Sequence, residues 1–392
     1  MKEEFKLFLT RLLPFVLILA GIPLISYLIW FWTPTRNLEI LVVDKTVRDQ
    51  TYQEHHGIFW ILEHGKFKKS EDRFYDSSQD YLGFFPDRSA QNYGQIKDLT
   101  GKSRSDIDSL VRKKDLIFIA DTYGVFENDF NKPPVENPST KIYGGMDLSE
   151  IRLIQSAKEQ GKTVIAEYNS MASPTPKPIR TEFENLMGIK WTGWIGRYFD
   201  ELDTVQNGDI PLWMRKEYKA QHGTWDLAGP GLIFVKESGE IEAFLMKRDF
   251  QNQTPLIRTQ KVNKHGFKLP QVIPYPDWFD VVMIERDYQV VSYYDINPTA
   301  SGLQRLRTMG LPRFFPAVVY RQIGEGRQYY FAGDFSDIKK DLGSPKFSGL
   351  PFLWRSLYVA ADFTDRQSFF WNYYQPLLEQ ILQQEHQSKK KD

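Results

Sequence analysis

The sequence predicts an α/β protein in which an N-terminal transmembrane helix precedes a Rossmann-like, mostly parallel sheet with an antiparallel, β-rich C-terminal extension. Three observations predict this fold class. Residues 12–32 form one uncharged apolar run, three short apolar runs between residues 38 and 166 each lead into an acidic residue, and hairpin-like segments follow residue 231. Hydrophobic residues make up 41% of the chain and charged residues 26%, a composition that can form a sizeable core.

The apolar run of residues 12–32 is long enough to cross a bilayer. At 1.5 Å per residue, a helix of this length spans about 30 Å, which is the thickness of the hydrocarbon layer. A secretory signal peptide has a shorter apolar region that ends in small residues, whereas this run ends in Trp30, Phe31 and Trp32. We therefore predict an uncleaved signal-anchor helix that binds membrane lipid, preceded by a short tail of residues 1–11.

The charges beside this helix bear on its orientation. Three basic residues precede the helix and three lie between residues 33 and 48, so the positive-inside rule separates the two orientations only weakly. Arg11 directly adjoins the apolar run and the tail is very short. Both features favour a cytoplasmic tail and an extracytoplasmic globular domain at the cell membrane. The opposite orientation, with a nucleotide or small molecule as ligand, stays open.

Residues 38–230 show alternating strand and helix patterns. The apolar runs at residues 38–43, 116–120 and 163–166 are continuous and mostly rich in β-branched residues, which is typical of strands buried on both faces of a parallel sheet. Apolar residues recur at helical spacing in residues 52–64 and 148–160. This alternation predicts βαβ units and a Rossmann-like α/β domain over residues 38–230.

The region after residue 230 has a different pattern. Residues 231–246 resemble a β-hairpin with a Ser-Gly turn. Further short apolar runs occupy residues 280–284, 290–294, 317–321 and 328–332. We expect residues 231–376 to form a β-rich extension of the same domain or a small second domain. A helix is expected at residues 377–384, so residues 377–392 are assigned to a terminal helix and a basic tail.

The composition excludes several kinds of function. The chain has no cysteine, which excludes a thiol nucleophile, a disulfide, an iron–sulfur cluster and a cysteine-type zinc site. Lys+Arg and Asp+Glu are equal at 50 each, so there is no basic excess for sequence-independent nucleic-acid binding. Aromatic residues make up 15% of the chain, including 10 Trp. Such rings stack on sugars in glycan-handling proteins, and they also fill cores.

The candidate catalytic residues are the acids that end the three predicted parallel strands: Asp44, Asp121 and Glu167. Ligands of open parallel sheets bind outside the carboxyl ends of the strands. Two such carboxyl groups could serve as general acid and base on a glycosidic bond, or they could hold a divalent metal ion. The alternative is that these acids only form turns and cap helices. No recognised metal-ligand spacing occurs in the sequence, so we predict neither a metal site nor a cofactor.

Polar and aromatic residues beside these acids are candidates for substrate binding. Three of them lie one or two residues after a strand-ending acid, two lie in the aromatic and glycine-rich segment 191–199, and one follows the last predicted strand. An arginine in such a segment can bind a carboxylate or phosphate with its planar fork, or it can be half of a buried ion pair. The candidates are Tyr123, Tyr168, Asn169, Trp194, Arg197 and Asp334.

Four strand-end sequences, LEILVVD, LIFIAD, TVIAEYN and YYFAGDF, resemble the layout of the class I glutamine amidotransferase-like superfamily. The nearest branches in style are the ThuA-like proteins and the middle domain of some β-galactosidases. The resemblance implies a Rossmann-like fold whose members often act on carbohydrate or lie beside it. Amidotransferase chemistry needs a nucleophilic cysteine, and this chain has none. Glutaminase activity is therefore excluded.

Two functions from different classes follow from these observations. The first is a membrane-anchored extracytoplasmic protein that binds or processes a polysaccharide or cell-envelope glycan, with the three acids as the catalytic set if the protein is an enzyme. The second is a non-catalytic scaffold or accessory subunit of an envelope assembly or export complex, with an envelope protein as its partner. The second function predicts a shallow cleft and a sizeable exposed apolar patch.

Overall fold

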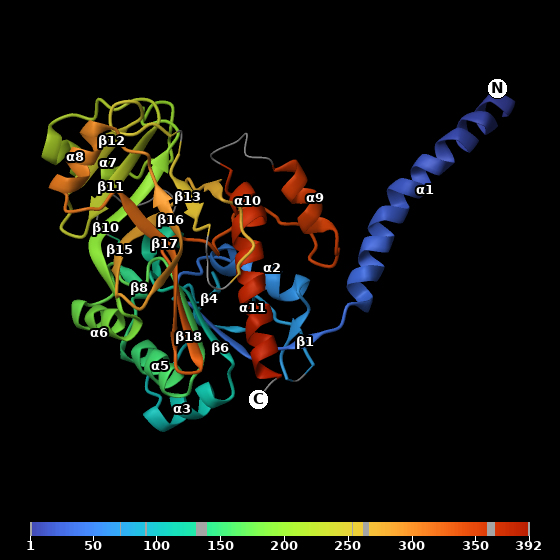
Figure 1. Ribbon diagram of the computed structural model, residues 1–392, viewed down its shortest axis with the longest axis horizontal. Helices are drawn as coiled ribbons and strands as arrows, with labels where there is room; N and C mark the ends of the chain where they lie inside the picture. The colour runs from blue at the N-terminus through green and yellow to red at the C-terminus, as the bar shows by residue number, and fades with distance from the viewer. Residues whose placement is uncertain are drawn as a thin grey trace.

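The computed structural model describes residues 2–70, 72–90, 92–130, 139–252, 254–261, 266–358 and 365–390. It shows a mixed α/β architecture whose sheets include parallel strands and whose C-terminal part is rich in β structure (Figure 1). The coarse fold class predicted from the sequence is thereby confirmed. The narrower Rossmann-like layout stays a prediction. The last two residues of the basic tail lie outside the described residues.

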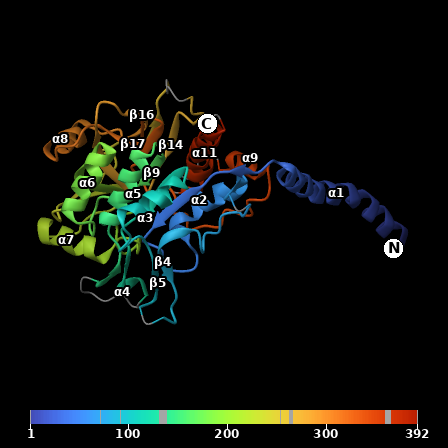
Figure 2. The ribbon, with the colours of Figure 1, turned by 90° about the horizontal axis from the view of Figure 1, so that it is seen from below.

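The N-terminal helix α1 (Lys2–Trp32) extends away from the rest of the molecule (Figures 1 and 2). Its apolar stretch is unburied, and it is long and apolar enough to cross a membrane, a test that a signal sequence also meets. The contacts with the domain that the described residues show involve its last seven residues, from Ser26 to Trp32. There the Trp30 ring is buried, its Nε1 donates to the carbonyl oxygen of His64, and Lys66 Nζ donates to the carbonyl oxygen of Phe31.

A ten-stranded sheet forms the centre of the domain. Its parallel part contains five strands, and antiparallel strands extend it at both edges. The middle strands are continuous apolar runs buried on both faces, as expected for a parallel sheet. The strand order is β14 (Val272–Pro274), β13 (Leu256–Thr259), β16 (Gln289–Asp295), β17 (Phe314–Ile323), β18 (Gly326–Phe331), β9 (Thr163–Glu167), β6 (Leu116–Asp121), β2 (Ile40–Asp44), β4 (Tyr81–Pro86) and β5 (Gly94–Lys97).

Helices cover both faces of this sheet (Figures 1 and 2). Helices α2 (Gln53–His64) and α11 (Gln375–Lys389) pack together on one face, and α3 (Arg104–Arg112) and α5 (Leu148–Glu159) pack together on the other. Capping boxes begin both α3 and α5, where an Asp or Ser side chain satisfies backbone N–H groups that the first helical turn leaves free. The helices that follow the neighbouring strands β2 and β6 therefore lie on opposite faces of the sheet. In open sheets, a crevice forms between two strands whose connections diverge in this way.

A second, antiparallel sheet of four strands packs beside the carboxyl end of the first. Its order is β12 (Ile241–Leu245), β11 (Gly231–Lys236), β10 (Ile189–Phe199) and β15 (Phe279–Ile284). The segment after β18 joins the two sheets. Asp280 N–H donates to the carbonyl oxygen of Ala332 at 3.0 Å, and Asp334 N–H donates to that of Trp278 at 3.4 Å. These bonds hold the second sheet over the strand ends of the first.

A close approach between β2 and β4 depends on Gly83, whose φ is +152°, because a Cβ there would lie 1.6 Å from the carbonyl oxygen of Asp44.

The remaining described elements are β1 (Arg36–Asn37), β3 (Phe67–Lys68), β7 (Val125–Phe126), α4 (Glu127–Phe130), β8 (Lys141–Tyr143), α6 (Lys177–Met187), α7 (Leu212–His222), α8 (Ala300–Thr308), α9 (Leu350–Leu357), α10 (Arg366–Phe369) and the π-helical turn η1 (Phe370–Tyr374).

Candidate functional site

A cavity of about 450 Å³ lies between the two sheets. The segments that follow β2, β6, β9 and β18 form one wall, so the cavity opens at the carboxyl ends of four neighbouring parallel strands. Strand β10, the end of β11, the start of α7 and the residues just before β15 form the opposite wall. The position and size agree with ligand sites in α/β proteins, which usually have volumes of about 300–1,000 Å³.

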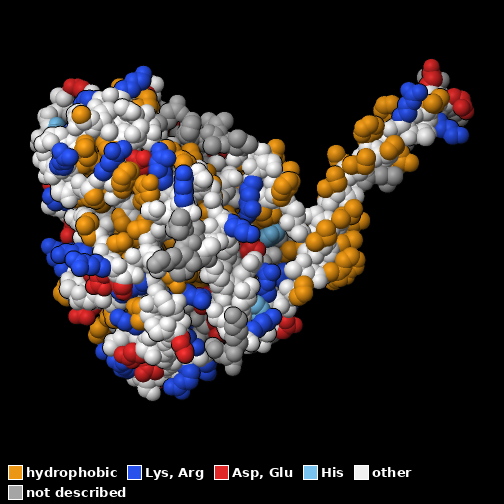
Figure 3. Space-filling view, viewed as in Figure 1, with side chains coloured by type: hydrophobic (Ala, Val, Ile, Leu, Met, Phe, Trp, Pro, Cys, Tyr) orange, Lys and Arg blue, Asp and Glu red, His pale blue; other side chains and the backbone are white. Residues whose placement is uncertain are grey.

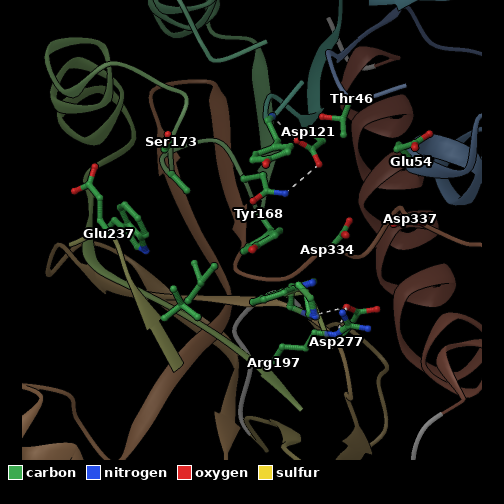
Figure 4. Close-up of a pocket in the computed structure, with 18 of the residues that line it drawn as sticks. Thr46, Glu54, Asp121, Tyr168, Ser173, Arg197, Glu237, Asp277, Asp334 and Asp337 are labelled. Carbon is green, nitrogen blue, oxygen red and sulfur yellow. Dashed lines mark hydrogen bonds and ion pairs between the residues drawn. The ribbon is translucent and has the colours of Figure 1, made fainter. Parts of the chain in front are cut away.

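Asp121, the last residue of β6, faces this cavity (Figure 4). Its carboxylate accepts hydrogen bonds from Tyr123 N–H at 2.6 Å and from Asn169 Nδ2 at 3.2 Å. Asn169 follows β9 in the left-handed region, with φ of +65°, which asparagine adopts more readily than most residues. Burial, followed by the nearby charge of Asp44, raises the pKa of Asp121 to about 7.

Asp334 and Asp337 lie on the segment after β18, and both line the cavity. Burial, followed by the charge of Asp337, raises the pKa of Asp334 well above its usual range. Burial also raises the pKa of Asp337, against the opposing charge of Arg366. The Oδ1 atom of Asp337 is buried without a hydrogen-bond partner among the described residues. Burial and mutual repulsion therefore make it costly to ionise both carboxyl groups in this poorly solvated site.

Asp277 differs from these acids because two arginines neutralise it. Arg366 Nη1 lies 2.9 Å from Asp277 Oδ2, and Arg197 Nε lies 3.8 Å from Asp277 Oδ1. Burial raises the pKa of Asp277, but the charges of Arg366 and Arg197 outweigh burial, so the pKa is lowered overall. Asp277 therefore stays ionised while Asp334 holds a proton more tightly. This contrast is typical of sites that use one carboxyl group as an acid and another as a fixed charge.

A fifth acid, Glu54 at the start of α2, reaches the cavity from the side of β2. Arg48 Nε lies 3.1 Å from Glu54 Oε1, and Glu54 Oε2 is buried without a described partner. Burial, followed by the charge of Asp44, raises the pKa of Glu54 to about 8, against the opposing charge of Arg48. The cavity thus brings together several carboxyl groups that hold protons near neutral pH.

Aromatic side chains form much of the remaining lining. Tyr123 and Trp213 are about half exposed at the mouth, with 42% and 49% of their surface accessible. Trp278 lies under the Arg197 guanidinium, 5.5 Å from the carbon at its centre to the ring centroid. Tyr168 and Trp191 complete the aromatic lining deeper inside. Flat rings beside carboxyl groups suit a ligand that has apolar faces and many hydroxyl groups.

Six of the nine site residues predicted from the sequence line this cavity. They are Asp121, Tyr123, Tyr168, Asn169, Arg197 and Asp334. Asp44 does not line the cavity. Its carboxylate is fully buried and bonded to His55 Nδ1 at 2.7 Å and to the N–H of Thr46 at 2.9 Å. Its contribution to the cavity is electrostatic, through the pKa of Asp121 and of Glu54.

Glu167 and Trp194 also lie outside the cavity lining. Glu167 Oε2 accepts from the backbone N–H of Ser336 at 3.0 Å and from Ser336 Oγ at 2.6 Å, and Tyr374 Oη donates to Glu167 Oε1 at 3.0 Å. Burial raises the pKa of Glu167 to about 8. The Trp194 ring is buried in the core, and Lys236 Nζ lies 5.0 Å from its centroid. The roles predicted for all nine residues stay predictions.

Several lining residues were not identified from the sequence. Asp337 lies three residues after Asp334 in the segment FAGDFSD. This closeness to a predicted site residue is the only local signal that could have pointed to Asp337. Asp277 and Glu54 had no such signal, since neither ends an apolar run. The described residues contain no group of three His, Asp or Glu side chains arranged to hold a metal ion.

Comparisons with known proteins concern the fold alone. No protein-family model matches the chain, and no curated protein matches it. A glutamine amidotransferase from Thermotoga maritima is 7% identical, with 90% of this chain and 99% of that chain covered and a TM-score of 0.37. A ThuA-like protein from Bacteroides uniformis is 10% identical, with 80% and 89% covered and a TM-score of 0.32.

A third similar structure is a β-galactosidase from Bacillus circulans sp. alkalophilus, at 10% identity and a TM-score of 0.32. The match covers 76% of this chain but only 30% of the β-galactosidase. The resemblance to glutamine amidotransferase-like and ThuA-like proteins that the sequence suggests is therefore found, as a weak likeness of fold. At these identities and TM-scores, the similarity carries no information on activity.

Proposed function

We propose that this chain is a membrane-anchored, extracytoplasmic protein that binds or processes a polysaccharide or cell-envelope glycan. One observation carries the proposal: a single cavity combines carboxyl groups that hold protons near neutral pH with a lining of Tyr and Trp rings. Sugars present hydroxyl groups at their edges and apolar C–H faces above and below the ring. Carboxyl groups bind the hydroxyl groups, and aromatic rings pack on the faces.

The chemistry proposed for this cavity is acid-assisted cleavage of a glycosidic bond. The protonated carboxyl group of Asp334 would give its proton to the glycosidic oxygen as the bond from that oxygen to the sugar carbon breaks. Asp121, on the same wall of the cavity, would accept a proton from the attacking water. A raised pKa suits the first role, and Asn169 orients the carboxylate for the second. These steps use only side chains of the chain itself.

Helix α1 would keep this activity at a membrane. The helix is long and apolar enough to span a bilayer, and its exposed Phe, Leu and Ile side chains would face lipid. An extracytoplasmic domain tethered in this way would meet envelope glycans at a high local concentration. Arg11, which directly precedes the span, supports this orientation.

Glycan binding is tested with the detergent-solubilised full-length protein on a panel of envelope oligosaccharides. The Tyr123→Ala variant loses one stacking surface, so its Kd should rise roughly fivefold, which corresponds to about 1 kcal/mol. Phe314→Ala is the matched control, because Phe314 is equally exposed at 42% and does not line the cavity. Equal affinity of both variants, or no binding by the wild-type protein, would contradict the proposal and favour the accessory-subunit alternative.

Turnover is tested with Asp334→Asn, which keeps the shape of the side chain and removes its exchangeable acid proton. We expect release of reducing ends to fall about 10²- to 10⁴-fold while the Kd for the bound oligosaccharide stays within about twofold. A variant that cleaves as fast as the wild-type protein would exclude Asp334 as the acid. A wild-type protein that binds glycan without cleaving it would restrict the function to binding.

A further inference from the structure

Helix α9 presents an apolar surface to solvent. Phe352 is 78% exposed, Leu357 63% and Leu353 49%, and all three lie within the eight residues of the helix. The opposite side of the helix is fixed to the domain, where Arg355 Nε donates to the carbonyl oxygen of Trp371 at 2.9 Å and Trp354 packs against the core. The exposed face is therefore held rigidly outward. Elsewhere in the domain, the exposed hydrophobic side chains are more scattered.

This face lies next to the anchor helix. Ser26, in α1, accepts hydrogen bonds from two residues just before α9: its Oγ from Gly349 N–H at 2.9 Å and its carbonyl oxygen from Ser348 N–H at 3.2 Å. The rings of Tyr27 and Phe347 also meet, with centroids 6.3 Å apart. Figure 1 shows α9 on the side of the domain toward which α1 extends, and Figure 3 shows hydrophobic side chains over both helices.

The contact at Ser26 sets the depth of α9 relative to a bilayer. Ser26 lies within the uncharged apolar run and six residues before the end of α1, at Trp32, which corresponds to about 9 Å along the helix axis. Amphipathic helices that lie in a membrane surface bury their apolar face about 5–10 Å below the headgroups. If Trp32 lies at the membrane surface, α9 lies at this depth.

We propose that α9 is a second membrane contact, an interfacial helix whose Phe352, Leu353 and Leu357 side chains enter the outer acyl layer of the bilayer that α1 spans. The inference rests on the membrane anchoring proposed above. Its basis is the continuity of the two apolar surfaces and the hydrogen bonds at Ser26, which place α9 beside the span. Two contacts restrict the rotation of the domain about α1, so the domain would keep a fixed tilt on the membrane.

The absence of cysteine from the chain allows a direct depth measurement. Phe352→Cys is labelled with an environment-sensitive fluorophore in the full-length protein, which is then reconstituted into phosphatidylcholine and phosphatidylglycerol vesicles with brominated acyl chains. Leu357→Cys is a second α9 reporter. Ile18→Cys, in α1, reports on the anchor, and Val205→Cys, which is 92% exposed in the domain, reports on water. All four positions are exposed, so the substitutions remove no core packing.

We expect the labels at positions 18, 352 and 357 to shift to shorter emission wavelengths and to lose most of their intensity to the brominated chains, while the label at position 205 does neither. Quenching at position 18 without quenching at positions 352 and 357 would overturn the α9 inference and leave the anchor intact, so that the apolar face would be open to a protein partner. No quenching at position 18 would overturn the proposed anchoring, and the inference with it.

Discussion

Glu167 ends a strand and does not line the cavity, but it holds the segment that carries two of the cavity's acids. Its carboxyl group binds Ser336, which lies between Asp334 and Asp337 in sequence, and it also binds Tyr374 of η1. A group that fixes the segment carrying both acids is a positioning residue. Because its pKa is raised to about 8, Glu167 is mostly protonated at neutral pH, and a neutral amide is then its nearest isostere.

We expect Glu167→Gln to keep the unfolding free energy within about 1 kcal/mol of the wild-type value, since its amide oxygen can still accept from Ser336. Glu167→Ala leaves a cavity and unpaired donors and should cost about 2–4 kcal/mol. Urea unfolding in detergent measures both variants, and glycan binding shows whether the segment with Asp334 has moved. A Gln variant as unstable as the Ala variant would mean that Glu167 acts as a buried anion.

For single residues, the sequence predicted which side chains end the strands but not which of them face the cavity. Patterns of apolar residues identified the strand ends, so Asp121 and the residues after it were found. Whether a strand-ending side chain points into a cavity or into a hydrogen-bond network depends on neighbours far away in sequence. Asp44 bonds to a histidine of the next helix, and Glu167 bonds to residues 169 and 207 positions later. No local pattern encodes those contacts.

Among the elements, those with strong periodicity were predicted best. Helices α2 and α5, the hairpin of β11 and β12, and strands β2, β6 and β9 are confirmed within a few residues of the predicted ranges. Strand β10, the longest described strand, was not predicted. Gly193 and Gly196 interrupt its apolar pattern, and a β-bulge shifts its pairing with β15 between Trp191 and Ile195. The sequence analysis therefore did not predict that the cavity wall carrying Arg197 is a β-sheet.

The predicted orientation of helix α1, with the domain outside the cytoplasm, can be tested in cells by cysteine labelling, because the chain has no cysteine of its own. A membrane-impermeant maleimide should label Val205→Cys in intact cells, or after opening of any outer membrane, because the domain is expected outside the cytoplasm. Phe5→Cys, 64% exposed on the other side of the span, is the matched control and should react only after the inner membrane is permeabilised. The reverse labelling pattern would place the domain in the cytoplasm.

Burial raises the pKa of several carboxyl groups in the domain well above the unfolded value. A folded state that binds these protons more tightly than the unfolded chain loses stability as the pH rises from about 4.5 to about 8. Glu39 has the opposite effect. Although burial opposes the shift, hydrogen bonds from Lys114 and Ser70 lower its pKa from 4.5 to about 2. Its contribution to stability is therefore lost only as the pH falls from about 4.5 to about 2. The raised groups include Asp121, Glu150 and Asp280, at about 7, and Glu54 and Glu167, at about 8.

We therefore expect the Tm of the detergent-solubilised protein to be higher near pH 5 than near pH 8.5. Each unit of pKa difference corresponds to about 1.4 kcal/mol, so the total effect should exceed the experimental error of a melting curve. Circular dichroism across this pH range measures it. Glu167→Gln removes one of the titrating groups and should flatten the curve. A Tm that does not change between pH 5 and pH 8.5 would show that these groups ionise in the folded state as they do in the unfolded chain, and would contradict the prediction.

The strand order has a consequence for how the protein is made. Strand β18 lies between β9 and β17, so residues near the end of the chain complete a sheet begun by residues near its start. Until Gly326–Phe331 has emerged from the ribosome, β9 presents an open edge. A product that ends before Gly326 therefore leaves the edges of β9 and β17 unpaired and cannot form the ten-stranded sheet.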